Sequence, residues 1–128
     1  STRRALDRVI SETVDNDGLT LILALSYGSR EEILDATKSI ASQVHEGSLS
    51  LDQIDHDTFS NNLYSSETPD PDLLIRTSGE FRLSNFLLWQ LSYAEIFISA
   101  KNWPDFRKDD FRAAVSDYAR RHRRFGRV

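Results

Sequence analysis

Short continuous apolar runs mark the segments that we predict to be strands. LTLILALSY, residues 19–27, follows an Asn-Asp-Gly turn signal at 16–18, and LLI, residues 73–75, follows a loop rich in serine and proline at 65–72. Such runs are typical of parallel strands that are covered on both faces. A third strand is predicted over residues 95–99.

Apolar residues at helical spacing predict the helices. From residue 30 to residue 45 they fall on one stripe, and Gly47 ends the pattern. That stripe consists of Ile33, Ala36, Ile40 and Val44. A shorter helix is expected over 55–63. A similar spacing begins almost at the first residue, which suggests a segment of a longer protein, although loss of an initiator methionine would explain the absence of methionine equally well.

Two further helices are expected nearer the carboxyl end of the chain. Residues 86–93 are apolar nearly all round, and Ser84 or Asn85 would cap a helix there. Residues 108–121 carry an apolar face made of Phe111, Ala114, Val115 and Tyr118. Strands alternating with helices predict an α/β architecture with a parallel sheet flanked by helices, without an internal domain boundary in 1–128.

Composition narrows the function classes. The 128 residues are 39% apolar and 28% charged, which is typical of one globular domain with a modest core. The absence of cysteine removes disulfides and thiolate chemistry, and three scattered histidines leave little for zinc. No apolar run reaches about 18 residues, so we expect a soluble chain. The lack of cysteine permits a reducing compartment, and we expect the cytoplasm. A net charge of −4 argues against nucleic-acid binding, the local exception being RRHRRFGR at 120–127.

Candidate chemistry lies where the predicted strands end, because open α/β sheets bind ligands beyond the carboxyl ends of their strands. The segments 27–30 and 76–84 both qualify, and the second is richer because it contains Arg76, Arg82 and Ser84. Two guanidiniums, a hydroxyl and helix amides would suit a phosphate or diphosphate. The alternative is a solvated loop in which the arginines pair with protein carboxylates. The candidate carboxylates are Asp70, Asp72 and Glu80.

One long segment resembles a known family. PDLLIRTSGEFRLSNFLLWQLSYAEIFISAKNWPDF, residues 71–106, resembles the signature of the cis-prenyltransferases of the undecaprenyl diphosphate synthase type, and GLTLILALSYGSREEI and RRFG are similar to other parts of that family. The resemblance implies a non-Rossmann parallel-sheet fold, and residues 1–128 as the C-terminal portion of one isoprenyl transferase domain. It also implies a homodimer that condenses isopentenyl diphosphate onto an allylic diphosphate such as farnesyl diphosphate with Mg²⁺. The product would be a cis-polyprenyl diphosphate, the cell wall lipid carrier, released through peripheral membrane contact.

The resemblance also assigns roles to particular residues. It implies that isopentenyl diphosphate is bound by Arg76, Arg82, Leu83 and Ser84, with Leu83 contributing its backbone amide. Glu95 matches the magnesium-associated glutamate. Glu80 is expected to orient the arginines by hydrogen bonding.

Two departures from the family pattern limit what the chain can do. The NYGGR-type turn is replaced by SYGSR at 26–30, so Ser29 takes a glycine position, and Arg30 is expected to be structural and paired with carboxylates. The N-terminal MDGNGRW-type motif, whose aspartate carries magnesium, does not occur, so the chain alone is expected to be inactive. The alternative function is a non-catalytic partner subunit or binding domain of the same fold. Nucleic-acid binding through the basic cluster at 120–127 is the weakest alternative, because basic residues are expected at a helix C-terminus.

Overall fold

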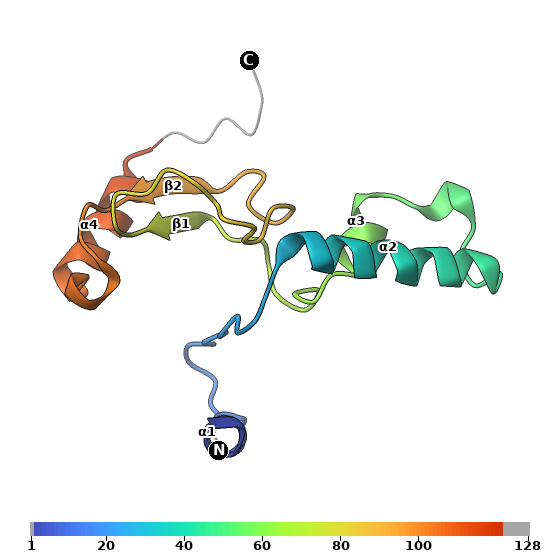
Figure 1. Cartoon of the computed structure of the whole chain (residues 1–128), viewed down its shortest axis with the longest axis horizontal. Coiled ribbons are helices and arrows are strands. Elements are labelled where there is room, and N and C mark those ends of the chain that lie inside the picture. The colour runs from blue at the N-terminus through green and yellow to red at the C-terminus, as the bar shows by residue number, and fades with distance from the viewer. Residues whose placement is uncertain (1, 122–128) are drawn as a thin grey trace.

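The computed structural model of the chain describes residues 2–121 and contains a small parallel sheet with helices on either side of it (Figure 1). The helices are α1 (Thr2–Thr13), α2 (Ser29–His45), α3 (His56–Ser60) and α4 (Lys108–Ala119), with short 3₁₀ turns at η1 (Leu51–Gln53) and η2 (Trp103–Asp105). The strands are β1 (Leu73–Arg76) and β2 (Glu95–Ile98). Figure 1 shows α4 beside the sheet, α2 and α3 together on the opposite side, and α1 apart from both.

The sheet confirms the predicted parallel pairing. Leu73 lies opposite Glu95, and Arg76 lies opposite Ile98. Both strands are mostly half-buried rather than covered on both faces, which corrects the prediction for residues 73–75. Residues 77–94 form the crossover between the two strands. A parallel pair usually uses a helix for this purpose, but here the crossover is the loop that carries the candidate site.

The predicted strand over 19–27 is wrong. Residues 19–26 are exposed and have no strand partner among residues 2–121. Leu19 is 92% exposed and Leu21 is 76% exposed. A strand depends on ladder hydrogen bonds and cross-strand packing, and the described part of the chain places no second strand beside this segment. The apolar run therefore has no regular secondary structure, and together with α1 it lines an open groove of about 560 Å³.

The predicted helix over 86–93 is also wrong. The segment consists of turns, closed by bonds such as Leu91 N–H to the Leu87 carbonyl at 2.9 Å and Ala94 N–H to the Leu91 carbonyl at 3.1 Å. The backbone is left-handed at Ser84, Asn85 and Leu87. Left-handed residues cannot continue a right-handed helix, so the helix amides expected as phosphate donors are not formed.

Helices α2 and α4 confirm the periodic pattern, although fewer of their apolar residues are buried than expected. Ala36 and Ile40 on α2 are buried together with Leu63, and Ala114 on α4 is fully buried. Gly47 ends the α2 region with a φ of +75°, and its N–H donates to the Val44 carbonyl at 3.1 Å. Contrary to the prediction for α4, two residues of its apolar face are largely exposed. These are Phe111 at 53% and Val115 at 41%.

A buried carboxylate joins α2 to the crossover. Glu32 is 1% exposed and accepts hydrogen bonds from the Tyr64 N–H at 2.9 Å, from the Gln90 amide at 3.2 and 3.3 Å, and from the Tyr27 hydroxyl. Burial, followed by the bond to Glu32, raises the pKa of Tyr27 above its ordinary value. A buried charge is tolerated when it is fully hydrogen-bonded. Glu32 therefore fixes the crossover at Gln90 relative to α2.

Candidate functional site

A cavity of about 400 Å³ lies beside the sheet and is bordered by the loop that follows β1. Its lining consists of Leu74, Arg76, Phe81, Arg82, Leu83, Ile96 and Ile98. Five of these side chains are apolar and two carry guanidinium groups, so the cavity has apolar walls and a positively charged edge. Arg76 and Arg82 lie at the same cavity, as their positions after a strand end predict.

Arg76 is the last residue of β1 and supplies an unsatisfied donor. Its Nε is buried and has no hydrogen-bond partner within residues 2–121. A buried donor without a partner costs about 1 to 3 kcal/mol, and a buried polar group of this kind needs an explanation such as a ligand. An anion in the cavity would remove that cost, because guanidinium forks bind phosphate oxygens bidentately.

Arg82 is held by a neighbouring carboxylate of the same loop. Its Nη1 forms an ion pair with Glu80, and the side chains are 63% and 36% exposed. Glu80 therefore contacts one of the two arginines, as the family resemblance implies. Because the pair is exposed it contributes little to stability, and the remaining donors of the Arg82 guanidinium make no hydrogen bond within residues 2–121. Leu83, the next residue, donates no backbone hydrogen bond to the part of the chain that the structure describes.

The turn after β1 fixes where these residues lie. Ser78 and Gly79 are both left-handed, and their N–H groups donate to the carbonyls of Lys101 at 2.7 Å and Ser99 at 2.8 Å. The turn is thereby tied to the segment that follows β2. Ser84 is exposed, has a φ of +53°, and is not among the residues that line the cavity. The structure thus brings Arg76, Arg82 and Leu83 together and leaves Ser84 at the margin.

Glu95 lies at the opposite end of the sheet from Arg76. It begins β2 opposite Leu73, so in this parallel pair it is three residues, or about 10 Å, along the strand direction from the end that bears Arg76. Glu95, which is predicted to bind the metal ion, and Arg76, which is predicted to bind the diphosphate, therefore do not line the same cavity.

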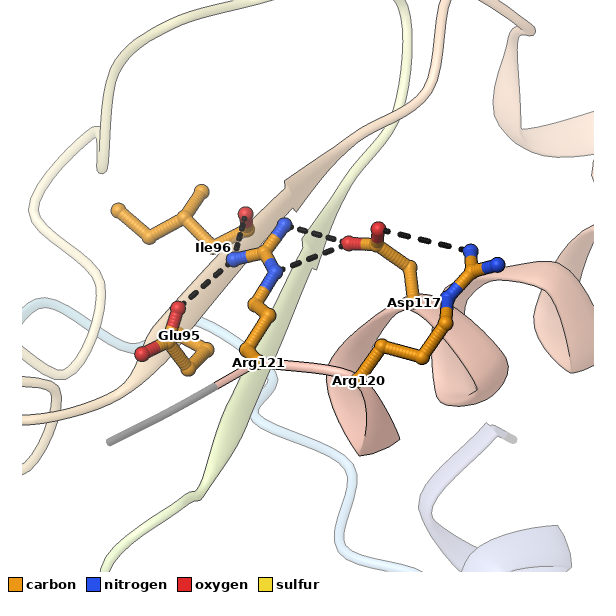
Figure 2. A network of polar contacts seen from close by, with 5 residues as sticks. All are labelled: Glu95, Ile96, Asp117, Arg120 and Arg121. Carbon is orange, nitrogen blue, oxygen red and sulfur yellow. Dashed lines mark hydrogen bonds and ion pairs between the residues drawn. The ribbon is translucent and has the colours of Figure 1, made fainter.

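The Glu95 carboxylate is already paired (Figure 2). Its Oε2 accepts from Arg121 Nη1 at 2.8 Å, and the same guanidinium donates to Asp117 Oδ2 at 2.6 Å and to the Ile96 carbonyl at 3.0 Å. The bond to Glu95, followed by the bond to Asp117, raises the pKa of Arg121 above its ordinary value. This network joins the start of β2 to the end of α4.

The residues present do not by themselves fit a Mg²⁺ site. Mg²⁺ usually binds one or two carboxylates together with substrate phosphates, but the carboxylate of Glu95 is engaged by a guanidinium. Within residues 2–121 no group of three or more His, Cys, Asp or Glu side chains could hold a metal ion. Glu95 is at most one ligand of a site completed by other groups.

Sequence reasoning missed one residue, Arg121, and misjudged two others, Asn85 and Arg30. The pairing of Arg121 with Glu95 is not signalled by the sequence, although the Asp117–Arg121 spacing of i, i+4 is a recognisable ion-pair signal. Asn85 was predicted to cap a helix that does not form, and instead contacts α2. The side chain of Arg30 makes no ion pair among the described residues, which corrects the expected pairing. The basic cluster at 120–127 is described only in part, since its residues 122–127 lie outside the described residues.

These features define a class. A parallel α/β sheet that presents two guanidiniums over an apolar cavity is suited to a ligand with an anionic group and an apolar portion. The family model described as "Putative undecaprenyl diphosphate synthase" matches residues 1–126. The chain therefore belongs to the undecaprenyl diphosphate synthase family, and the resemblance found in residues 71–106 is confirmed.

Curated relatives agree with this assignment. The chain is 48% identical over 127 residues to the isoprenyl transferase of Bacillus subtilis (strain 168), which covers 99% of this chain and 49% of that protein. It is 52% identical over 126 residues to the isoprenyl transferase of Heliobacterium mobile, which covers 98% of this chain and 48% of that protein. The chain thus spans about half the length of the curated relatives it matches.

Solved structures confirm the α/β fold of the cis-prenyltransferase type. A crystal structure of lavandulyl diphosphate synthase from Lavandula x intermedia, in complex with dimethylallyl diphosphate, matches with a TM-score of 0.91 at 42% identity, over 97% of this chain and 53% of that chain. A "probable undecaprenyl diphosphate synthase" from Campylobacter jejuni matches with a TM-score of 0.79 at 36% identity, over 98% and 56% respectively. No helix within residues 2–121 is long and apolar enough to cross a membrane.

Proposed function

We propose that residues 1–128 are the C-terminal portion of a cis-prenyltransferase domain and provide its binding site for isopentenyl diphosphate. The observation that carries this proposal is the buried Nε of Arg76, which has no hydrogen-bond partner within residues 2–121 and lies at the cavity that Arg82 also lines. The diphosphate would take the guanidinium edge, with the Leu83 amide as a further donor and Ser84 reaching the ligand at the margin. The apolar walls would take the isopentenyl group.

In the whole enzyme, the ligand held here would be condensed onto an allylic diphosphate such as farnesyl diphosphate. The residues of this chain would supply proximity, because they fix one substrate by its diphosphate and leave its apolar end directed to the second substrate. Arginine suits this task because it stays charged at any working pH. A growing isoprenoid chain would need an apolar path, which the cavity walls begin.

The resemblance extends the proposal to the surroundings of the enzyme. We place it in the cytoplasm as a homodimer that touches the membrane at product release and does not bind nucleic acid. When bound, Mg²⁺ would stabilise the charge on the departing diphosphate of the allylic substrate. Glu95 would serve as one carboxylate near that ion, which requires that Arg121 release it or share it.

Calorimetric titration of the chain with isopentenyl diphosphate tests the binding site. Arg76→Ala and Arg82→Ala should each weaken binding about 10- to 100-fold, because a charge-assisted contact to an anion contributes about 1.5 to 3 kcal/mol. Arg112→Ala is the matched control, since Arg112 is 64% exposed on α4 and is not among the residues that line the cavity. Equal affinities for all four proteins would overturn the proposal.

A second candidate is a non-catalytic partner subunit, which the exposed apolar run at 19–26 favours because such a surface supports association. Radiolabelled isopentenyl diphosphate, farnesyl diphosphate and Mg²⁺ distinguish the two functions. The chain alone should form no product. Adding the part of the Bacillus subtilis relative that this chain does not cover should restore prenyl transfer if the chain is catalytic, whereas association without product would indicate a partner subunit.

A further inference from the structure

Helix α2 begins without a capping side chain of its own. Its N-cap residue is Gly28, so the first N–H groups of the helix lack a local side-chain acceptor. Asn85 supplies two acceptors from the crossover. Ser29 N–H donates to the main-chain carbonyl of Asn85 at 2.8 Å, and Arg30 N–H donates to Asn85 Oδ1 at 2.8 Å. Asn85 therefore caps a helix that begins more than fifty residues earlier in the chain.

The contact is reinforced on both sides. Asn85 Nδ2 donates to Glu31 Oε2 at 3.2 Å, and the hydroxyl of Ser29, which is completely buried, accepts from Leu88 N–H at 2.9 Å. A Cβ atom at Gly28 would lie 2.9 Å from Asn85 Nδ2, so the glycine permits the close approach. The start of α2 and the crossover are thus joined at residues 85 and 88.

The backbone at this contact is in a conformation that needs support. Ser84, Asn85 and Leu87 have φ angles of 53°, 62° and 45°. Asparagine tolerates left-handed geometry, but for serine and leucine it is costly and persists only when the surroundings hold it. The hydrogen bonds of Asn85 to α2 provide that support. Arg82 and Leu83, which line the cavity, immediately precede the left-handed pair.

We propose that Asn85 is a positioning residue for the anion-binding loop. By capping α2 it holds the arm 82–84 in one conformation, so that the Arg82 guanidinium and the Leu83 amide are kept at the cavity before the ligand arrives. This inference rests on the proposed function for the identity of the ligand. The structural effect of Asn85 on the arm 82–84 is independent of the proposed function, and hydrogen exchange of the Ser29 and Arg30 amides measures it.

The test measures two quantities on the full chain: hydrogen exchange of the Ser29 and Arg30 amides, and affinity for isopentenyl diphosphate. Asn85→Ala should expose both amides to faster exchange and weaken binding about fivefold, because losing a cap leaves the binding-competent arm less populated. Asn85→Gly keeps the left-handed backbone and the main-chain acceptor, so only the Arg30 amide should lose protection. It also keeps the test informative if the alanine variant does not fold.

A rescue variant separates positioning from general destabilisation. Asn85→Asp combined with Glu31→Gln reverses the hydrogen bond between these side chains and retains an acceptor for the Arg30 N–H, so exchange and affinity should both return close to the unmodified values. Asn61→Ala is the matched control, since the Asn61 side chain is exposed and makes no hydrogen bond within residues 2–121.

The outcomes separate the inference from the proposed function. If Arg82→Ala weakens binding but Asn85→Ala does not, Asn85 has no positioning role. Loss of affinity in Asn85→Ala with unchanged amide exchange would make Asn85 a direct ligand contact and would also overturn the inference. If Arg76→Ala and Arg82→Ala leave affinity unchanged, the proposed function fails, whatever the exchange of the two amides shows.

Discussion

Two apolar segments with similar composition, residues 19–25 and strand β1, lie in different environments. In 19–25 the leucines and the isoleucine are more than half exposed, and its one short-range backbone bond joins Leu25 N–H to the Leu23 carbonyl at 3.2 Å. Strand β1 is paired along its length with β2. The difference shows that apolar character alone does not make a strand. The partner strand supplies the ladder and the side-chain contacts that stabilise it.

The largest expected effect comes from placing a charge in strand β1, and the same change in residues 19–25 is the comparison. Ile75→Asp should destabilise the chain by about 2 to 4 kcal/mol, because it puts an unpaired carboxylate in the half-buried paired strand. Leu23→Asp should change the free energy of unfolding by less than about 0.5 kcal/mol, since Leu23 is 57% exposed. Urea unfolding followed by circular dichroism measures both. Similar losses in the two variants would mean that 19–25 is packed after all.

A smaller effect is expected where α4 covers β2. Ala114 is 0% exposed, and Ala114→Leu should cost about 1 to 3 kcal/mol because the added carbons have no space. Ala113→Leu on the exposed side of the same helix is the control and should lie within about 0.5 kcal/mol of the unmodified chain. Thermal unfolding of both variants gives the comparison. Equal stability would show that α4 does not pack tightly on the sheet.

The ion pair at the start of β2 should contribute less. Arg121→Ala removes the bonds to Glu95 and Asp117 and should cost about 1 kcal/mol, because the Arg121 side chain is 32% exposed and solvent screens the pair. Arg120→Ala should have almost no effect, since Arg120 is 78% exposed and lies 4.0 Å from Asp117. Denaturant midpoints at low and high salt would measure the difference. If Arg121→Ala lowered the stability equally at low and high salt, the stabilisation by Arg121 would not be electrostatic.

The smallest effect concerns pH. Hydrogen bonds from Lys101 and from the Arg107 N–H lower the pKa of Asp110 in the folded chain. The Asp110 carboxylate therefore stabilises the fold above its unfolded pKa of about 4, and this stabilisation is lost as the pH falls through the folded pKa. Asp110→Asn should therefore flatten the decline in stability below about pH 5. Asp109→Asn, at a residue 93% exposed, should leave the pH profile unchanged. Identical profiles for both variants would exclude Asp110 as a source of acid sensitivity.

The sequence predicted those elements whose signals are local. The stripe of α2 ends at Gly47, which has the left-handed φ that glycine permits. Strand β1 and the position of Arg76 at its end followed from the apolar run and its flanking loop. The parallel sheet placed Arg76 and Arg82 at one cavity, as strand-end geometry predicts.

The remaining features could not be predicted because they depend on contacts between distant segments. The left-handed backbone at Asn85 is supported by the start of α2, and this interrupts a segment whose composition favours a helix. The pairing of Glu95 with Arg121 joins a strand start to the residue after a helix end. Residues 19–25 are exposed because no strand within residues 2–121 pairs with them, which the composition of the segment does not reveal.

The parallel register of β1 and β2 has a consequence for the order of folding events. The two strands can pair only after residues 77–94 have looped back, and the entropy of closing that loop must be overcome before any ladder bond forms. The same residues carry Arg82 and Leu83 to the cavity. Assembly of the sheet and assembly of the loop that borders the cavity are therefore coupled, and substitutions that stiffen the crossover should speed both together.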